Sequence, residues 1–445
     1  MMDLFQRFRA LFRRRYEDNG IAYSEESEDE GRSPGRGDQR VLFTALDIGT
    51  AFAKAIIVEV REDEAIVLGV GRHPQNYPHM ADGIVTDIAG VTANCNEALI
   101  EAEKKAGGVV APATIIGIAG ELVKGSSITI SKQRSQPEKQ ISGDELASLM
   151  TGAQQKLLKL SKESIASETG YNNIEVRLTN AAVISVRVDG QLVSNPVGFK
   201  GRNISLTLFS AFAPLMQLGA LETVAQGLDL MLHSIIVEPY ALARCLSMNA
   251  GADSGAIFID VGGGTTDIAL MRQGGIEETR MFALGGRTFT RRLSISKGMS
   301  PKQAEELKIA YSNGALKDSG RDEIRAIMAP ECQTWMDSVE LLIEELSKGE
   351  LLPPAIYTVG GGSALPDLRQ KLESFPWTER LPFARAPLIQ SVQPDMVSSI
   401  VDPKGMLKDT QDITPMALAF QAIELQHEDS ILERTLYQVI RSMHV

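Results

Sequence analysis

Two turns in the sequence place a carboxylate beside glycines and hydroxyls. In FIDVGGGTTDIAL, residues 258–270, Asp260 follows one apolar run, and a second apolar run begins after Asp267. The glycines between them leave the backbone open, and successive N–H groups in such a turn can bind an anion. A carboxylate repels phosphate, but Mg²⁺ bridges carboxylate, water and phosphate oxygens. The stretch therefore predicts either a metal–phosphate site or a glycine-rich hairpin with a solvated aspartate.

The same pattern occurs earlier, in VLFTALDIGTAFAKAIIVEV at residues 41–60. An apolar strand ends at Asp47, a turn of small residues includes Gly49 and Thr50, and a second strand carries Lys54. Asp47 and Asp260 are 213 positions apart, which predicts two similar halves that face each other and not a repeat array. Lys54 either neutralises phosphate charge or faces solvent.

A third glycine cluster, VGGGSALPDLRQKL at 359–372, follows the short apolar run 356–359. We expect it to begin a helix, because the free N–H groups at a helix N-terminus also bind anions or nucleotides. The three turns together favour a nucleotide site more strongly than any one of them does alone.

An ordered series of stretches resembles the actin-like ATPase superfamily and, within it, the FtsA family of bacterial cell-division proteins. The three turns resemble the phosphate-1, phosphate-2 and adenosine motifs of the superfamily. The resemblance to the FtsA family rests on ADGIVTDI (81–88), IIGIAGELVKG (115–125), SNPVGFKG (194–201), IIVEPYALA (235–243), ALGGRTFTRRL (283–293) and AEELKIAYSNGA (304–315). It extends from about 41 to 425 and weakens at 320–350 and 375–410.

The resemblance implies an α/β, two-domain actin-like ATPase fold with ATP and Mg²⁺ in the interdomain cleft and a small inserted α+β subdomain of the 1C type. It assigns Mg²⁺, held through water, to Asp47 and Asp260, and catalysis to these two with Glu238. The residues that it assigns to the nucleotide are Gly49, Thr50, Lys54, Gly262, Gly263, Gly264, Thr265, Thr266, Glu305, Lys308, Gly360, Gly361 and Gly362. Any ATPase activity is expected to be slow.

Three of these side chains, and Asp267 beside them, have a second interpretation. Glu238 either lies near the attacking water or serves only as a helix N-terminal residue before Pro239. Glu305 and Lys308 either border the adenosine or form a solvated helix face. Asp267 either belongs to the site or caps the turn.

Composition narrows the class of protein. The chain has 445 residues and is 43% hydrophobic, enough for more than one core, and its net charge of −12 argues against general nucleic-acid binding. Cys95, Cys245 and Cys332 have no metal-ligand spacing and predict buried free thiols in a reducing cytosol. Five dispersed histidines predict no histidine metal site, and no apolar run is long enough to span a membrane.

The first forty residues have a different composition. Residues 1–16 place Leu4, Phe5, Phe8, Leu11 and Phe12 on one helical stripe, and five arginines against one aspartate give a charge of +4. Residues 17–40, with eight acids and three arginines, predict a disordered linker. The helix suits an anionic membrane surface, and the alternative is docking on the body or a partner. FtsA proteins generally carry such a helix at the C-terminus. The stretch 428–445 is also amphipathic, and either contacts a membrane or packs on the body.

The predicted domain boundaries follow the motifs. They are 1–16 for the basic helix, 17–40 for the linker, 41–125 and 213–250 for the two parts of the first domain, 126–212 for the insertion, 251–412 for the second domain with its smaller subdomain at about 288–354, 413–427 for a closing helix and 428–445 for the tail. In the insertion, Ser142 and Glu145 predict a capping box and a helix to about 159. Strands are expected at 174–178, 182–188 and 204–210, with a hairpin turn at Asp189-Gly190.

These features predict a peripheral protein on the cytoplasmic face of the cell membrane at the division site. It would tether filaments of FtsZ by their C-terminal peptide, recruit other division proteins and assemble into actin-like filaments. The alternative is PilM, a cytoplasmic platform of type IV pilus assembly. A sugar or acetate kinase would need a catalytic base and a substrate pocket in a large insertion, for which the sequence offers no candidate. A DnaK-type chaperone would need a long C-terminal substrate domain.

Overall fold

The structure is a computed structural model that describes residues 40–171, 173–247, 255–272, 274–426 and 431–443. The chain divides into two compact units, 1–40 and 41–445, and only the second is treated below. The basic helix, with Leu4, Phe5, Phe8, Leu11 and Phe12, and the acidic linker lie outside the described residues, except for Arg40.

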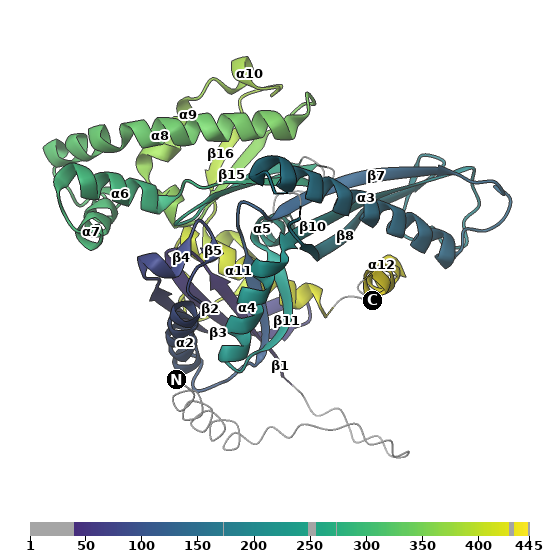
Figure 1. The fold of residues 1–445 in the computed structure, drawn as a ribbon, viewed down its shortest axis with the longest axis horizontal. Coiled ribbons are helices and arrows are strands. Elements are labelled where there is room, and N and C mark those ends of the chain that lie inside the picture. The colour runs from purple at the N-terminus through teal and green to yellow at the C-terminus, as the bar shows by residue number, and fades with distance from the viewer. Residues whose placement is uncertain (1–39, 172, 248–254, 273, 427–430, 444–445) are drawn as a thin grey trace. The chain divides into compact units, whose positions relative to one another are not determined.

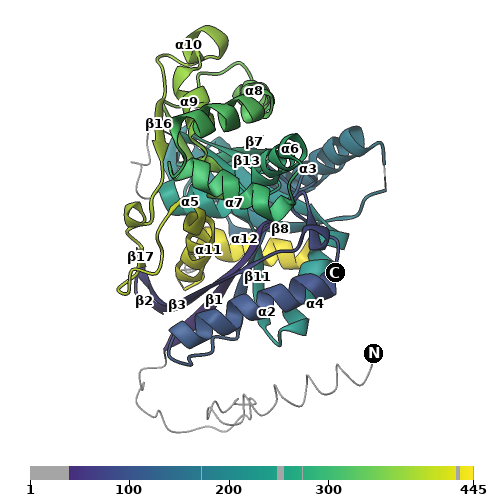
Figure 2. The same ribbon diagram turned by 90° about the vertical axis from the view of Figure 1, so that its left-hand side faces the viewer.

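The first half of the body is built on a six-stranded sheet of order β11-β6-β1-β2-β3-β17. Its strands are β1 (Val41–Ile48), β2 (Phe52–Arg61), β3 (Glu64–Pro74), β6 (Ala113–Ile118), β11 (Met231–Val237) and β17 (Ile400–Val401). The antiparallel β1–β2 hairpin predicted at 41–60 is confirmed, and its register pairs Asp47 with Lys54. Helices α2 (Ile88–Lys105) and α4 (Leu215–Gly227) cover one face of this sheet, while α5 (Glu238–Ser247) and α11 (Ile413–Glu424) lie between it and the second sheet (Figure 2).

The second half shares a nine-stranded sheet of order β16-β15-β12-β13-β14-β7-β10-β8-β9. Its own strands are β12 (Ala256–Val261), β13 (Thr266–Arg272), β14 (Gly275–Phe282), β15 (Ala355–Val359) and β16 (Leu388–Ser391). Helices α6 (Gly286–Lys297), α7 (Pro301–Ser312), α8 (Asp318–Ser347), α9 (Pro366–Ser374) and α10 (Trp377–Arg380) lie on its outer side (Figure 1). Along β12, Phe258 enters the core shared with the first half, and Ile257 and Ile259 enter the core beneath α8, as the two-residue period of a strand requires.

The insertion consists of β7 (Lys124–Gln133), α3 (Gly143–Thr169), β8 (Val176–Val188), β9 (Gln191–Val193) and β10 (Asn203–Pro214). The turn at Asp189-Gly190 is confirmed, because Val188 pairs with Gln191 and both turn residues have positive φ. Several details of the prediction were wrong. The two strands predicted at 174–188 are one strand, and the helix runs to Thr169.

The predicted capping box is also incomplete. The Ser142 side chain accepts from the Glu145 amide, but the Glu145 carboxylate turns to Arg134 at 3.0 Å and does not return to the cap. An ion pair to a side chain that is almost fully buried competes successfully with the local hydrogen bond.

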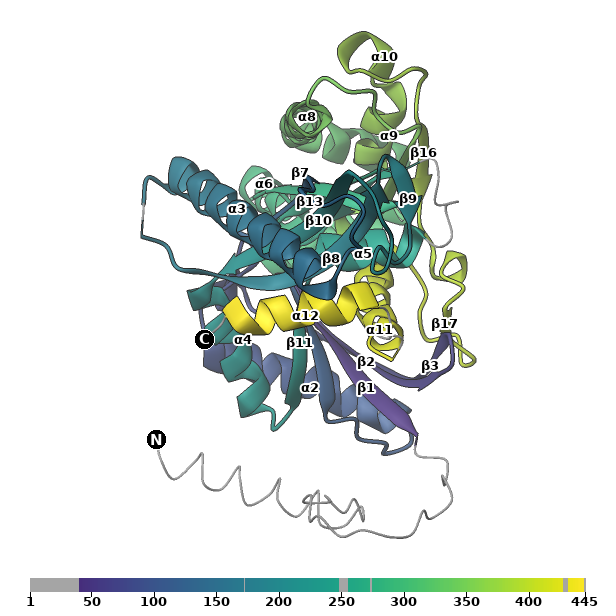
Figure 3. The same cartoon turned by 90° about the vertical axis from the view of Figure 1, so that its right-hand side faces the viewer.

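The insertion is not a separate small sheet. Its strand β7 pairs with β14 of the second half, with Gly125 opposite Thr279, so the insertion extends the sheet of the second half while its chain enters from β6 of the first. Helix α12 (Ile431–Met443) packs on α3 and β8, where Leu436 and Val439 are 3% and 4% exposed (Figure 3). Of the two interpretations of the C-terminal stretch, the structure shows the helix packed on the body.

Short elements complete the described chain. They are β4 (Met80–Ala81), β5 (Ile84–Val85) and the 3₁₀ turns Tyr77–His79, Gly361–Ala364, Pro394–Met396 and Thr410–Asp412. The three cysteines are free and buried, as predicted. Within the described ranges, no helix combines the length and apolarity needed to cross a membrane.

Candidate functional site

The first aspartate turn lies at the end of the β1–β2 hairpin. Asp47 is buried at the end of β1, and one of its carboxylate oxygens lies 2.8 Å from Lys54 Nζ. Lys54 also donates to the carbonyl oxygen of Gln411 at 3.0 Å, and its side chain is 14% exposed. The solvent-facing interpretation of Lys54 is therefore wrong. The ion pair with Asp47 raises the pKa of Lys54 even though burial alone would lower it.

The second aspartate turn joins β12 to β13, as predicted, and its two aspartates stand opposite each other in the register. Asp260 accepts a hydrogen bond from the Thr414 hydroxyl at 2.7 Å, and Asp267 accepts one from Thr265 at 3.2 Å. The second oxygen of Asp267 is buried without a hydrogen-bond partner. Asp267 thus ties back to the turn, as its capping interpretation expected, and retains an unused acceptor.

Thr266 points away from this turn. Its hydroxyl donates to the Leu284 carbonyl at 2.7 Å and accepts from the indole N–H of Trp335 at 2.9 Å. Because both partners belong to the second half, the hydroxyl serves to join the turn to α8. Trp335 is fully buried.

The two aspartate turns touch each other. A Cβ added to Gly263 would lie 2.6 Å from the Cβ of Ala51, and one added to Gly264 would lie 2.8 Å from the Thr50 hydroxyl. Glycine is required at both positions, since real side chains do not approach so closely. The turns therefore form one glycine-lined wall between the halves.

Four carboxylates and one lysine lie near these turns and influence one another: Asp47, Asp260, Asp267, Glu238 and Lys54. Burial is the main cause that raises the pKa of Glu238 and of Asp267 well above the usual range, and neighbouring carboxylates raise both further. Burial also raises the pKa of Asp260, against the opposing effects of Thr414 and Lys54. Such a group needs either protons or a cation to balance its charge.

Glu238 is the first residue of α5, and its Oε1 would lie 2.8 Å from a Cβ added to Gly117 at the end of β6. It is therefore both a helix N-terminal residue and a member of the carboxylate group. Among the described residues, no three His, Cys, Asp or Glu side chains converge to hold a metal ion.

The third glycine turn packs directly under the second. Gly360 has φ of +85°, and a Cβ there would lie 2.1 Å from a carboxylate oxygen of Asp260. The prediction that the glycines begin a helix was wrong. A 3₁₀ turn runs from Gly361 to Ala364, and α9 begins at Pro366, because proline is favoured in the first turn of a helix, where its missing N–H costs nothing.

Glu305 and Lys308 lie on α7 and face α6. Lys308 is buried, donates to the Gly286 carbonyl and the Thr290 hydroxyl at 2.9 Å each, and lies 2.8 Å from the Glu305 carboxylate. The solvated-face interpretation is therefore wrong for Lys308. Burial lowers the pKa of Lys308, and Glu305 opposes that effect.

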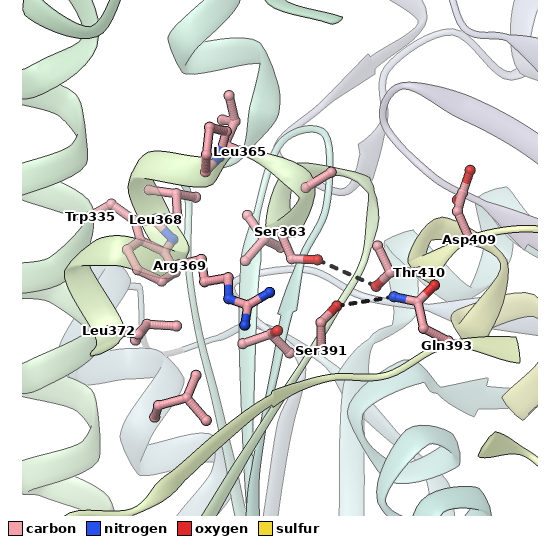
Figure 4. Close-up of a pocket in the computed structure, with 15 residues that line it drawn as sticks. Trp335, Ser363, Leu365, Leu368, Arg369, Leu372, Ser391, Gln393, Asp409 and Thr410 are labelled. Carbon is pink, nitrogen blue, oxygen red and sulfur yellow. Dashed lines mark hydrogen bonds between the residues drawn. The ribbon is translucent and has the colours of Figure 1, made fainter. Parts of the chain in front are cut away.

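A cavity of about 370 Å³ lies beside the third glycine turn (Figure 4). Its walls come from the ends of β12, β15 and β16, from α8 and α9, and from the loop at 409–410, and they include Trp335, Leu365, Leu368, Ser391 and Thr410. Ser363 and Thr410 are joined across it at 3.3 Å. None of the residues predicted to border the adenosine lines this cavity: Gly360, Gly361, Gly362, Glu305 and Lys308 all lie outside its lining.

Three residues of the site were not predicted from the sequence. Thr414 bonds Asp260 from 154 positions away, the Gln411 carbonyl bonds Lys54 from 357 positions away, and Arg287 bridges the two halves from α6. Local spacing holds no signal for the first two. Arg287 stood inside a recognised stretch, ALGGRTFTRRL, without a role.

The chain is similar in sequence to a family of bacterial cell-division proteins. A profile of the family "Cell division protein FtsA" matches residues 257–403. The cell division protein FtsA of Streptococcus pneumoniae is 24% identical over 347 residues, which cover 74% of this chain and 72% of that protein. The FtsA of Pseudomonas aeruginosa is 23% identical over 345 residues, with 73% and 78% covered.

A solved structure, described as a PilM-PilN type IV pilus biogenesis complex, has a chain similar to this one in fold. The two superpose with a TM-score of 0.63 at 17% identity, over 86% of this chain and 99% of that one. The similarity confirms the predicted fold class, that of the actin-like ATPases. At this identity it carries information on the fold alone.

Proposed function

We propose that this chain, a relative of the FtsA cell-division proteins with the actin-like ATPase fold, is a nucleotide-dependent adaptor of bacterial cell division. Nucleotide binding is supported chiefly by the contact between the two aspartate turns, where a Cβ added to Gly263 or Gly264 would collide with the other turn. A nucleotide-dependent adaptor needs a nucleotide site, a segment that attaches it to the membrane and a partner protein. Each of these can be tested separately.

The nucleotide is Mg²⁺-ATP. Gly49, Thr50, Gly262, Gly263, Gly264 and Thr265 would cradle the phosphates, and Lys54 would neutralise part of their charge. The unused oxygen of Asp267 and the raised pKa of Asp260 fit a site that gains a cation. Asp47 and Asp260 would hold the ion through water molecules. When bound, the ion would neutralise charge on the phosphates.

Calorimetry tests this assignment. Asp260→Ala should weaken Mg²⁺-ATP binding by about 1.5–3 kcal/mol, the worth of a contact to a charged group. Asp144→Ala, at the exposed start of α3, is the control. Unchanged affinity without any dependence on Mg²⁺ in the Asp260 variant would remove the site from this position.

We place the nucleoside in or beside the cavity next to the third glycine turn. The cavity combines apolar walls with hydroxyls at Ser363, Ser391 and Thr410, a lining typical of small-molecule sites. Ser391→Phe should fill it and weaken binding of ATP more than of inorganic phosphate, whereas Leu388→Phe, on the same strand but 61% exposed, should not. The contrary result, loss of affinity in Lys308→Met alone, would place the base against α7.

Hydrolysis, where it occurs, is assigned to Glu238. The residue lies among the carboxylates and starts a helix, and its raised pKa must fall before it can accept a proton from water. A bound cation would lower the pKa of Glu238. Glu238→Gln should slow phosphate release without changing ATP affinity. Equal phosphate release by both forms would leave Glu238 as a helix N-terminal residue only.

The attachment is the basic helix at 1–16. Its arginines each contribute about 1 kcal/mol near an anionic membrane surface. The remaining residues carry −16, the difference between −12 and +4, so the body alone is repelled by such a surface. Removing 1–16 should abolish sedimentation with anionic vesicles, and Phe8→Asp should weaken it strongly. Undiminished sedimentation of the truncated chain would transfer the attachment to another segment.

The partner is a cytosolic filament, which we take to be FtsZ held by its C-terminal peptide within residues 288–354. Helices α6, α7 and α8 occupy most of this range, and the acidic body favours a peptide with basic residues. As a flexible chain, a linker of 24 residues would have a span of roughly 25–30 Å. Filament formation by the body itself would multiply weak contacts by raising effective concentration.

Pull-down of the host's FtsZ with and without its tail, in ATP, tests the partner. Binding that survives loss of the tail would move the contact elsewhere. Capture of pilus-assembly proteins in place of FtsZ would favour a PilM-like role.

A further inference from the structure

Arg287, in the first turn of α6, reaches from the second half of the body to the first. Its guanidinium donates to the Gln75 carbonyl at 2.9 Å and to the Met80 carbonyl at 3.3 Å. Its Cζ atom also lies 4.2 Å from the centre of the Tyr77 ring, well within the range of cation–π attraction. The side chain thus holds three points of one loop, residues 75–80, that follows β3.

Both ends of this bridge are bonded to the phosphate turns. The Arg287 amide donates to the Gly263 carbonyl at 2.7 Å, and the neighbouring Gly286 amide donates to the Gly262 carbonyl at 2.9 Å. On the other side, the Gln75 amide donates to the Ala51 carbonyl at 2.8 Å. Ala51 and Gly263 are in turn the residues at which the two turns touch. The contacts therefore form a closed ring through both turns.

The position of α6 depends on this ring. Gly285 precedes the helix without a side-chain cap, and a Cβ there would lie 2.7 Å from the Gly262 carbonyl. The helix donates its first amides to the turn in place of a capping residue. A shift of the turn would therefore move α6, and with it the guanidinium on the loop.

We propose that Arg287 is a positioning residue that clasps loop 75–80 and so holds the two halves closed over the phosphate turns. This role rests on the proposed nucleotide site only in its consequence, which is that the clasp slows nucleotide dissociation. The clasp itself consists of contacts within the chain. Burial lowers the pKa of Arg287, and the phenol of Tyr77 and the carboxylates of Glu305 and Asp82 oppose that effect, so the group remains a cation between the halves.

The distance between the halves tests the clasp directly. Spin labels at Ile100→Cys on α2 and Ile309→Cys on α7, 38% and 47% exposed, report on the first and the second half, while the three native cysteines are buried. Without nucleotide, the full-length chain should give a narrow distance distribution. Arg287→Ala should broaden it and shift it to longer distances, and Arg287→Lys should fall between because lysine lacks the planar fork.

Matched variants separate the clasp from general damage. Arg292→Ala removes an arginine of the same helix that pairs with Glu331 inside the second half, so it should leave the distribution unchanged. Tyr77→Phe keeps the ring face and should behave as the wild type, whereas Tyr77→Leu should resemble Arg287→Ala. An Arg287→Ala protein that is folded by circular dichroism and gives the wild-type distribution overturns the proposal.

Nucleotide kinetics tests the consequence. Dissociation of a fluorescent ATP analogue with Mg²⁺ should be roughly tenfold faster in Arg287→Ala, the scale of one charge-assisted contact, and unchanged in Arg292→Ala. A changed distance distribution in a protein that binds no nucleotide would support the clasp and refute the proposed nucleotide site. A broader distance distribution in Arg287→Ala with an unchanged rate of nucleotide dissociation would refute the link between the clasp and nucleotide release.

Discussion

Thr266 offers a sharp test of how the second aspartate turn is held. Replacing it by valine keeps the shape of the side chain but removes the hydroxyl that donates to the Leu284 carbonyl and accepts from Trp335. The indole N–H is then buried without a partner, because Trp335 is fully buried.

The cost can be worked from these contacts. Leaving the indole N–H unsatisfied costs about 1–3 kcal/mol, and losing the bond to the Leu284 carbonyl costs about 1 kcal/mol. The added methyl group recovers about 1 kcal/mol by burial. Thr266→Val should therefore lower the free energy of unfolding by about 1–3 kcal/mol.

Urea denaturation of the metal-free protein measures this change, with Thr266→Ser as the control that keeps the hydroxyl. The serine variant should lose only about 1 kcal/mol for the missing methyl. Because the hydroxyl bonds Leu284 and Trp335 and not the proposed phosphate site, the affinity of Thr266→Val for Mg²⁺-ATP should fall much less than that of Thr265→Val. A Thr266→Val protein as stable as the wild type but unable to bind ATP would refute the reasoning and return Thr266 to the proposed phosphate site.

Three further predictions follow from the same contacts. In metal-free protein, folding raises the pKa of Asp267 above its usual 3.8, so its contribution to stability is complete below that pH and is lost as pH rises through the folded value. Asp267→Asn should thus be increasingly more stable than the wild type as pH rises from about 4 in urea titrations, and a constant difference would contradict this. Leu436→Asp should release α12 and speed its hydrogen exchange, while Ile431→Asp, at a position 41% exposed, should not; equal exchange in both variants would mean that α12 is not held by its buried face. Gly360→Ala should abolish Mg²⁺-ATP binding in calorimetry, since its Cβ would meet Asp260 at 2.1 Å, and retained affinity would show that the third turn can shift without loss.

The sequence alone was enough to locate the turns and most of the elements around them. Asp47 and Asp260 each follow an apolar run and precede glycines, and this local order predicts a strand, a turn and a second strand whatever lies elsewhere in the chain. The Asp189-Gly190 hairpin was predictable for the same reason, because a two-residue turn with positive φ needs these residue types. Order along the chain also carried the resemblance from which the fold class followed.

Tertiary structure decided what those side chains bond. Glu145 left its cap for Arg134, Thr266 turned to Trp335, and Lys54 was buried against Asp47. In each case a partner brought close by folding competed with water or with a neighbour in sequence. Burial then decided the outcome, because an unpaired polar group is costly where water is excluded.

Three contacts could not be predicted from the sequence. They are the pairing of β7 with β14, the packing of α12 on the insertion and the hydrogen bonds from Arg287 to loop 75–80. These contacts link segments from 150 to about 300 residues apart. Local residue order determines turns, caps and strands through short-range geometry, whereas which surfaces meet depends on how the apolar faces of all the elements are buried together. The sequence by itself therefore determined the parts of the site, and the packing of the two sheets determined how those parts are joined.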